Sequence, residues 1–155
     1  MHCHAPQELR LSAQQFKALL ANSNHQRKEA IRRRLCSVLV NGTPFPAPGD
    51  DATFKRDVQQ GIDRLTRMHQ AHQRALVAPK GTSAYTDAVL AFFKVTPKLG
   101  LRPMYEMIEA GHTPAQIGRA LGLDPSNVSR DRKKYRLARA AMQAYGSLAG
   151  NLCRH

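Results

Sequence analysis

The sequence has 155 residues, which is enough for one or two small domains with a buried core and too few for a large multidomain enzyme. It contains 24 Lys and Arg against 11 Asp and Glu, a formal net charge of +13, and this excess favours a polyanionic partner. The hydrophobic fraction of 42% is ordinary for a folded domain and argues against wholesale disorder.

Neither a membrane span nor a secretory leader is indicated. The longest apolar run, residues 88–93, is about a third of the length that a membrane-spanning helix needs. The first six residues lack the cationic and then apolar layout of a signal peptide. Cys3, Cys36 and Cys153 are odd in number and widely spaced, which fits reduced thiols better than a disulfide framework. We therefore expect a cytoplasmic protein without membrane contact.

Apolar residues recur at helical spacing in segment after segment and strand signals are almost absent, so the sequence predicts an all-α fold. Ser12 is placed to cap a first helix, and a second helix follows Asn24 and stops at Asn41-Gly42. The expected buried residues of these helices are Phe16, Leu19, Leu20, Ile31, Leu35, Val38 and Leu39. The second helix also carries basic residues that fit either phosphate contact or a solvated face: Arg27, Lys28, Arg32, Arg33 and Arg34.

A long third helix is expected after the proline-containing segment 43–49. Asp50 or Asp51 can cap it, Gly61 is a weak point within it, and Pro79 ends it. Its apolar series is Phe54, Val58, Ile62, Leu65 and Met68. A shorter helix is expected from Ser83, with Tyr85, Val89, Phe92 and Phe93 on its buried side. A domain boundary is expected at Pro79 or within residues 96–100, and we place it between residues 100 and 101.

Residues 109–130 contain the capping and turn residues that are typical of two short helices joined by a sharp turn. Thr113 can cap the first helix, Pro114 suits its first position, and Gln116 completes a capping box. Gly122 stands where a left-handed residue is needed, and Gly118 allows a second helix to approach closely. Asp124 and Pro125 then start the second helix. The apolar wedge between the helices is expected to be Ile117, Leu121, Leu123 and Val128.

This pattern resembles the helix-turn-helix of bacterial and phage DNA-binding regulators over about 22 residues, with Leu-Gly-Leu at the turn and Val-Ser-Arg in the second helix. Such motifs usually carry an apolar residue three positions after the Val; here Asp131 stands there, and Tyr135 is expected to pack instead. Residues 111–129 are also similar to the motif of the TrfB/KorA type of plasmid repressor. Residues 9–16 and 38–44 are similar to the opening segment of that family.

The resemblance implies a sequence-specific regulator, a repressor of the plasmid or phage type, whose second helix enters the major groove of double-stranded DNA. The expected base-reading residues are Ser126, Asn127, Ser129 and Arg130, with Arg130 suited to guanine and Asn127 to adenine. The expected phosphate contacts are Thr113, Gln116, Arg119, Arg132, Lys133, Lys134 and Arg136. Residues 101–155 would form this DNA-binding domain, and residues 1–100 a helical part of unassigned role.

A seven-residue repeat follows the motif: Val128, Tyr135, Ala138, Met142, Tyr145 and Ala149. This seam can join two copies of the chain, and a homodimer would fit an inverted-repeat operator with half-sites about 34 to 36 Å apart. The alternative is that the seam packs on the N-terminal helices of the same chain.

Other functions fit parts of the pattern. A DNA-organising adaptor, such as a plasmid-partition or phage DNA-packaging protein, uses the same motif, and charge alone also suits an RNA-binding module or a helical hairpin without a ligand. No phosphate-binding glycine loop, serine elbow or carboxylate pair is present, so we expect neither catalysis nor a cofactor. His69 and His72 are expected on the polar surface, Cys36 in the core, and a zinc site from residues 2–4 and 153–155 is the less favoured alternative to disordered termini.

Overall fold

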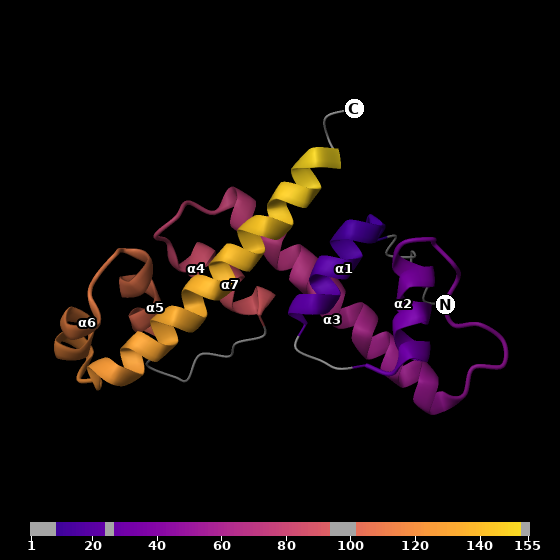
Figure 1. The fold of residues 1–155 in the computed structure, drawn as a ribbon, viewed down its shortest axis with the longest axis horizontal. Coiled ribbons are helices and arrows are strands. Elements are labelled where there is room, and N and C mark those ends of the chain that lie inside the picture. Colours follow the sequence, from indigo (N-terminus) through magenta and orange to yellow (C-terminus); the bar gives the residue numbers. More distant parts are fainter. Residues whose placement is uncertain (1–8, 24–26, 94–101, 153–155) are drawn as a thin grey trace, which may run out of the picture. The chain divides into compact units, whose positions relative to one another are not determined.

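The structure is a computed structural model that describes residues 9–23, 27–93 and 102–152. These ranges contain helices and no strand, which confirms the all-α prediction. In chain order the helices are α1 (Ala13–Asn22), α2 (Glu29–Leu39), α3 (Ala52–Val77), α4 (Ser83–Phe92), α5 (Arg102–Glu109), α6 (Pro114–Leu121) and α7 (Pro125–Leu152) (Figure 1).

The chain packs as two units, Met1–Thr66 and Arg67–His155, so the packing boundary falls inside α3 and lies earlier than the predicted boundary between residues 100 and 101. Part of the physical reason is α4. It precedes the predicted boundary, but it packs against α5 and α7 and therefore shares a core with the helix-turn-helix. We refer to the two parts as unit 1 and unit 2.

Unit 1 begins with the predicted cap at Ser12, which the structure extends to a capping box with Gln15. Ser12 Oγ accepts a hydrogen bond from the Gln15 backbone N–H at 3.0 Å, and Gln15 Oε1 accepts one from the Ser12 N–H at 3.0 Å. These bonds satisfy two amide groups that a helix start otherwise leaves unpaired. Phe16 and Leu19 are buried as predicted, whereas Leu20 is half-buried.

Gly61, predicted as a weak point of α3, is also a close-approach site between α2 and α3. A Cβ at this position would lie 2.8 Å from Leu35 Cδ1, and Leu35 is fully buried. Nearby, Asp50 accepts hydrogen bonds from the Arg34 guanidinium at 2.6 and 3.1 Å, which hold the pKa of this carboxyl below its ordinary value. Asp51 rather than Asp50 caps α3, since its Oδ1 accepts from the Phe54 N–H at 2.7 Å.

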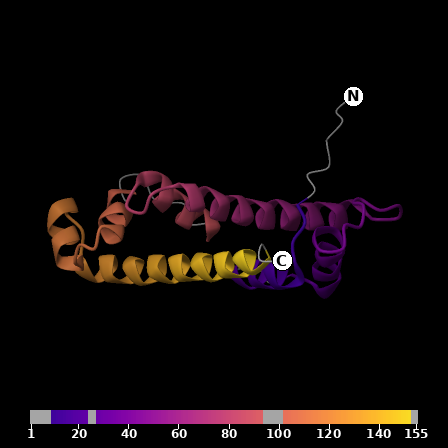
Figure 2. The ribbon, with the colours of Figure 1, turned by 90° about the horizontal axis from the view of Figure 1, so that it is seen from above.

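The core of unit 2 forms where α4 and α5 meet α7. Thr82 caps α4, and six of its ten residues are buried: Tyr85, Thr86, Ala88, Val89, Leu90 and Phe92. Figure 2 shows α7 as one uninterrupted helix from the turn after α6 to the end of the described chain. Because α7 contacts α4, α5 and α6, it is the element on which this unit is assembled.

The predicted dimer seam on α7 is part of this core, so a dimer through that seam is ruled out. Val128, Tyr135, Ala138, Met142 and Tyr145 are 0–2% exposed within a single chain, and they face helices of their own unit. The side chain of Ala149 lies outside the described part. The seven-residue period correctly indicates that this side of α7 is buried, but the helices that cover it belong to the same chain. They are α4 and α5, together with His69 and His72 of α3, which pack against Tyr145.

Two histidines predicted on the surface are inside unit 2. His72 is 5% exposed and its ring lies edge-on to Tyr145, 5.0 Å between centroids. His69 is half-buried, and its Nδ1 lies 2.5 Å from the Tyr145 hydroxyl oxygen. A Cβ on Gly146 would lie 2.7 Å from His72 Nε2, so this glycine makes room for the ring. Burial lowers the pKa of both histidines below the ordinary value.

The structure also bears on the predictions for Cys36, for a zinc site and for a membrane span. Cys36 is half-buried and has a free thiol, so it borders the core. Residues 1–8 and 153–155, which hold the alternative zinc ligands, lie outside the described residues. Among the described residues, no three His, Cys, Asp or Glu side chains are grouped as a metal site would need. Likewise, no helix in these ranges has both the length and the apolarity to cross a membrane.

Candidate nucleic-acid interface

The predicted two-helix corner is present with its predicted boundaries. Thr113 Oγ1 accepts from the Gln116 N–H at 3.2 Å, and Gln116 Oε1 accepts from the Thr113 N–H at 2.9 Å, which completes the capping box of α6. Gly122 ends α6 in the left-handed conformation, with φ 69° and ψ 34°. Asp124 then starts α7, since its Oδ1 accepts from the Ser126 N–H at 2.9 Å.

A small apolar wedge holds α6 against α7. Ile117 and Val128 are fully buried, whereas Leu121 and Leu123 are half-buried at its edge. Gly118 is the point of closest approach, because a Cβ there would lie 2.7 Å from the Leu123 carbonyl oxygen. The angle between the two helices therefore depends on a glycine at this position.

We expect Gly118→Val to lower the free energy of unfolding of unit 2 by about 1–3 kcal/mol, because a branched side chain has no space beside a backbone carbonyl that cannot rotate away. Urea unfolding followed by circular dichroism measures this effect. Arg119→Ala is the matched control, since Arg119 is the next residue of α6 and is exposed. Equal stability of the two variants would show that the close contact is not required.

A third helix supports the corner, and sequence analysis missed it. Met104, Tyr105 and Ile108 of α5 are buried, and α5 contacts α4, α6 and α7. The spacing of these three residues is helical and was the available signal, although eight residues are too few for a strong periodic pattern. The DNA-binding candidate is thus a three-helix arrangement of α5, α6 and α7.

Tyr135 replaces the apolar residue that the motif lacks at Asp131, as predicted. Tyr135 is 2% exposed, its ring lies 5.9 Å from that of Tyr105, and Asp131 is half-buried. The Tyr135 hydroxyl donates to Glu109 Oε2 at 2.7 Å, and Arg139 approaches the same oxygen at 3.2 Å. Burial, and then the hydrogen bond to the Glu109 carboxylate, raise the pKa of Tyr135 well above its ordinary value. These contacts tie α7 to the end of α5.

All four predicted base-reading residues are brought together at the exposed start of α7. Ser126, Asn127, Ser129 and Arg130 are all exposed. Two of them interact with each other, because Arg130 Nη2 donates to Asn127 Oδ1 at 2.6 Å. No part of the described chain covers this surface, so its side chains are accessible to a ligand.

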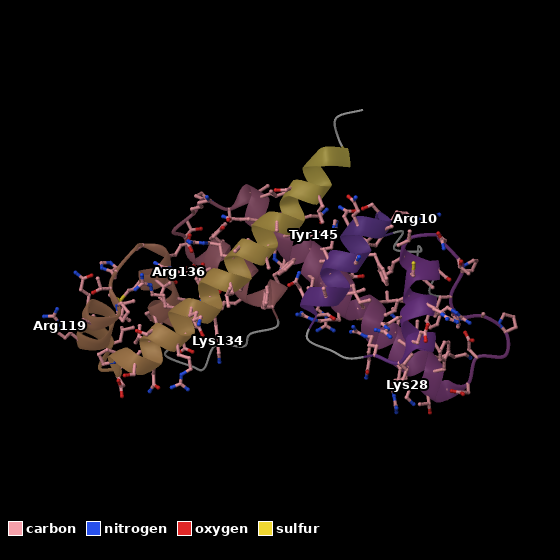
Figure 3. All side chains as sticks on the ribbon, in the orientation of Figure 1. Arg10, Lys28, Arg119, Lys134, Arg136 and Tyr145 are labelled. Atoms are coloured by element: carbon pink, nitrogen blue, oxygen red, sulfur yellow. The ribbon has the colours of Figure 1, made fainter. Side chains whose placement is uncertain are left out.

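The residues predicted to contact phosphate differ in their exposure and in how many hydrogen-bond donors remain free. Arg119, Lys133, Lys134 and Arg136 are exposed, and Arg132 is half-buried. Figure 3 shows Arg119 on the outer side of α6 and Lys134 beside α7, both pointing away from the ribbon. Thr113 and Gln116 are exposed, but their oxygens are used in the capping box, so only the Thr113 hydroxyl hydrogen and the Gln116 amide hydrogens remain for a phosphate.

Unit 2 carries most of the net positive charge of the chain, and several of its cations flank this corner. Residues 67–155 contain 14 Lys and Arg against 5 Asp and Glu, a net charge of +9 out of the +13 of the whole chain. No carboxylate in the described part forms an ion pair with Arg119, Arg132, Lys133, Lys134 or Arg136. An open groove of about 410 Å³ lies along α7, and the α7 residues that line it are Ser129, Arg132, Lys133, Arg136 and Leu137. This groove continues the exposed start of α7 with cationic side chains.

Comparisons with known proteins add no relative: no family model matches the chain, and neither a curated protein nor a solved structure was found to be similar to it.

Proposed function

We propose that this protein is a sequence-specific, double-stranded DNA-binding transcriptional repressor of the helix-turn-helix type. One observation carries the proposal: the first turns of α7 are exposed on one side, beside cations without a carboxylate partner, while the opposite side is locked into the core of unit 2. A helix held in this way is a rigid element that can enter the major groove without rearrangement of the fold.

In this proposal the roles divide along α7. Arg130 pairs with the O6 and N7 acceptors of a guanine, Ser126 and Ser129 contact neighbouring base edges, and Asn127 belongs to the same base-reading surface beside Arg130. Arg132, Lys133, Lys134, Arg136 and, on α6, Arg119 neutralise backbone phosphates, together with the remaining donors of Thr113 and Gln116. The first group supplies sequence preference, and the second supplies affinity that falls as salt rises.

A homodimer on an inverted-repeat operator in the cytoplasm belongs to the same proposal. Because the α7 seam is buried inside one chain, the two copies would meet through another surface. Two half-sites about 34 to 36 Å apart in the bound DNA would support the dimer, and a single isolated half-site would contradict it.

Two substitutions separate base reading from phosphate binding. We expect Arg130→Ala to reduce the preference for the selected duplex over a random duplex by roughly 5- to 150-fold, because a bidentate contact with guanine is lost. We expect Lys133→Ala to weaken binding to both duplexes alike and to reduce the slope of log affinity against log salt by about 0.9, because one phosphate contact is lost. Titration of labelled duplexes at several salt concentrations measures both effects.

Lys28→Ala is the matched control, since it removes one positive charge from an exposed side chain of unit 1 (Figure 3). It should leave preference and salt slope unchanged. If Arg130→Ala and Lys133→Ala act equally on both duplexes, the division into base reader and phosphate anchor is wrong. If Lys28→Ala has the same effect as Lys133→Ala, the phosphate-binding surface is not confined to the corner.

A further inference from the structure

The contact between Asn127 and Arg130 joins the two best-placed candidates for base recognition. The residues are three positions apart in α7, which places them as neighbours on one side of the helix. Arg130 Nη2 donates to Asn127 Oδ1 at 2.6 Å, a short distance typical of a hydrogen bond with a charged donor. Both side chains are exposed, so this bond lies on the surface that the proposed function presents to DNA.

This bond changes what Asn127 can recognise. To read adenine, an asparagine amide aligns its oxygen with the N6 amino group and its own amino group with N7, both on one base edge. Here the Asn127 oxygen is turned toward the Arg130 guanidinium. The structure therefore places Asn127 in the wrong orientation for the bidentate adenine contact that the sequence suggested.

The same bond leaves Arg130 ready for guanine. A guanidinium has five N–H donors, and Asn127 occupies only one of them, while guanine needs two for O6 and N7. Neither Asp124 nor Asp131, the carboxylates nearest in sequence, forms an ion pair with Arg130 in the described part of the chain. An exposed arginine side chain samples many rotamers, so a neighbour that accepts a hydrogen bond from its guanidinium favours one orientation and reduces the entropy lost on binding.

We propose that Asn127 is a positioning residue that orients Arg130 toward one guanine, and that the recognised half-site carries a guanine at that position. This inference rests on the proposed function. In this arrangement Arg130 and Asn127 act as a coupled pair that specifies one base pair. They are not two independent residues that each read a separate base pair.

The test is a double-mutant cycle on base preference. The measured quantity is the ratio of dissociation constants for the selected duplex and for duplexes in which one base pair at a time is replaced. Arg130→Ala should remove the preference at one G·C pair. Asn127→Ala should reduce the preference at that same pair by roughly 3- to 10-fold, the effect of one hydrogen bond. Adding Asn127→Ala to Arg130→Ala should produce no further loss, because Asn127 acts through Arg130.

A conservative variant distinguishes positioning from a general loss of structure. Asn127→Asp keeps an acceptor for Arg130, so the guanine preference should be retained, although the added negative charge weakens binding to every duplex. Ser147→Ala is the control, since Ser147 is exposed on α7 outside the candidate interface, and it should leave this base pair unaffected. Melting temperatures of all variants should stay close to that of the wild type, because these side chains are exposed.

Three outcomes would overturn the inference. Asn127→Ala could abolish the preference at a different base pair, an A·T pair in particular, and leave the guanine preference intact; Asn127 would then read a base itself. Asn127→Asp could lose the guanine preference to the same extent as Asn127→Ala, which would exclude the acceptor role. In both cases DNA binding by the wild type would stand and the proposed function with it. A wild-type protein that binds no duplex would refute both proposals together.

Discussion

Tyr135→Ala is expected to lower the free energy of unfolding of unit 2 by about 3–5 kcal/mol, the cost of removing an aromatic ring from a packed core. Tyr135 is 2% exposed and its ring packs beside that of Tyr105. Its hydroxyl also donates to Glu109, whose side chain is 3% exposed, so truncation leaves a buried carboxylate with fewer partners. Unfolding in urea, followed by far-ultraviolet circular dichroism, measures the change.

Two further variants separate the ring from the hydroxyl. Tyr135→Phe keeps the ring and should cost about 1–3 kcal/mol, since the hydroxyl and its hydrogen bond to buried Glu109 are lost. Arg136→Ala, at the next position and exposed, should change stability by less than about 0.5 kcal/mol. If Tyr135→Ala is no less stable than Arg136→Ala, then Tyr135 does not anchor α7, and the rigid presentation of its first turns loses its physical basis.

Acid is expected to destabilise unit 2 through buried His72 and half-buried His69. Burial lowers the folded-state pKa of His69 and His72 below the ordinary value of about 6.5, so the unfolded chain binds protons first as the pH falls. Their contribution to stability is therefore complete above about pH 6.5 and decreases below it, by at most about 1.4 kcal/mol per pH unit for each histidine. Unfolding free energies measured between pH 8 and pH 5 test this direction.

His72→Leu isolates the effect, because it keeps an apolar side chain in the site and removes one titrating group. Its stability should vary less between pH 8 and pH 5 than that of the wild type. Asp50 acts in a separate window: its lowered pKa means that its contribution is present above about pH 3.8 and is lost only at lower pH. A wild-type stability that stays constant or rises from pH 8 to pH 5 would contradict the burial of the histidines.

The helix-turn-helix corner could be predicted to the residue because its signals are local. A threonine followed three residues later by glutamine specifies a capping box, and a glycine after the last apolar residue specifies a left-handed helix end. Both were found, at Thr113 and Gly122. The exposure of Arg130 also followed from local geometry, since it is on the opposite side of the helix from buried Val128.

The partners of the long helices could not be predicted in this way. Periodicity shows that one side of α7 is buried, but it does not show what covers that side, because the same repeat serves a dimer and an intramolecular core. His69 and His72 were misplaced for a related reason. Their burial depends on Tyr145 and on the small Gly146, which lie more than seventy positions away in the sequence.

The boundary between the units also could not be predicted from local sequence patterns. Pro79 and residues 96–100 are the strongest breaks in the sequence, and a break in helical pattern is easily mistaken for a break in packing. The structure instead divides the chain within the uninterrupted helix α3. The contacts of α4 with α5 and α7, and those of His69 and His72 with Tyr145, place these segments in unit 2, and no local pattern encodes them.

The central claim, that the exposed start of α7 reads duplex DNA, is tested most directly by selection from a random pool. Purified full-length chain is incubated with random duplexes at low ionic strength, and the retained molecules are sequenced. One enriched motif containing a guanine is expected, and it should disappear when the selection is repeated with Arg130→Ala. A protein that retains no duplex, or that retains duplexes without any enriched sequence, would contradict it.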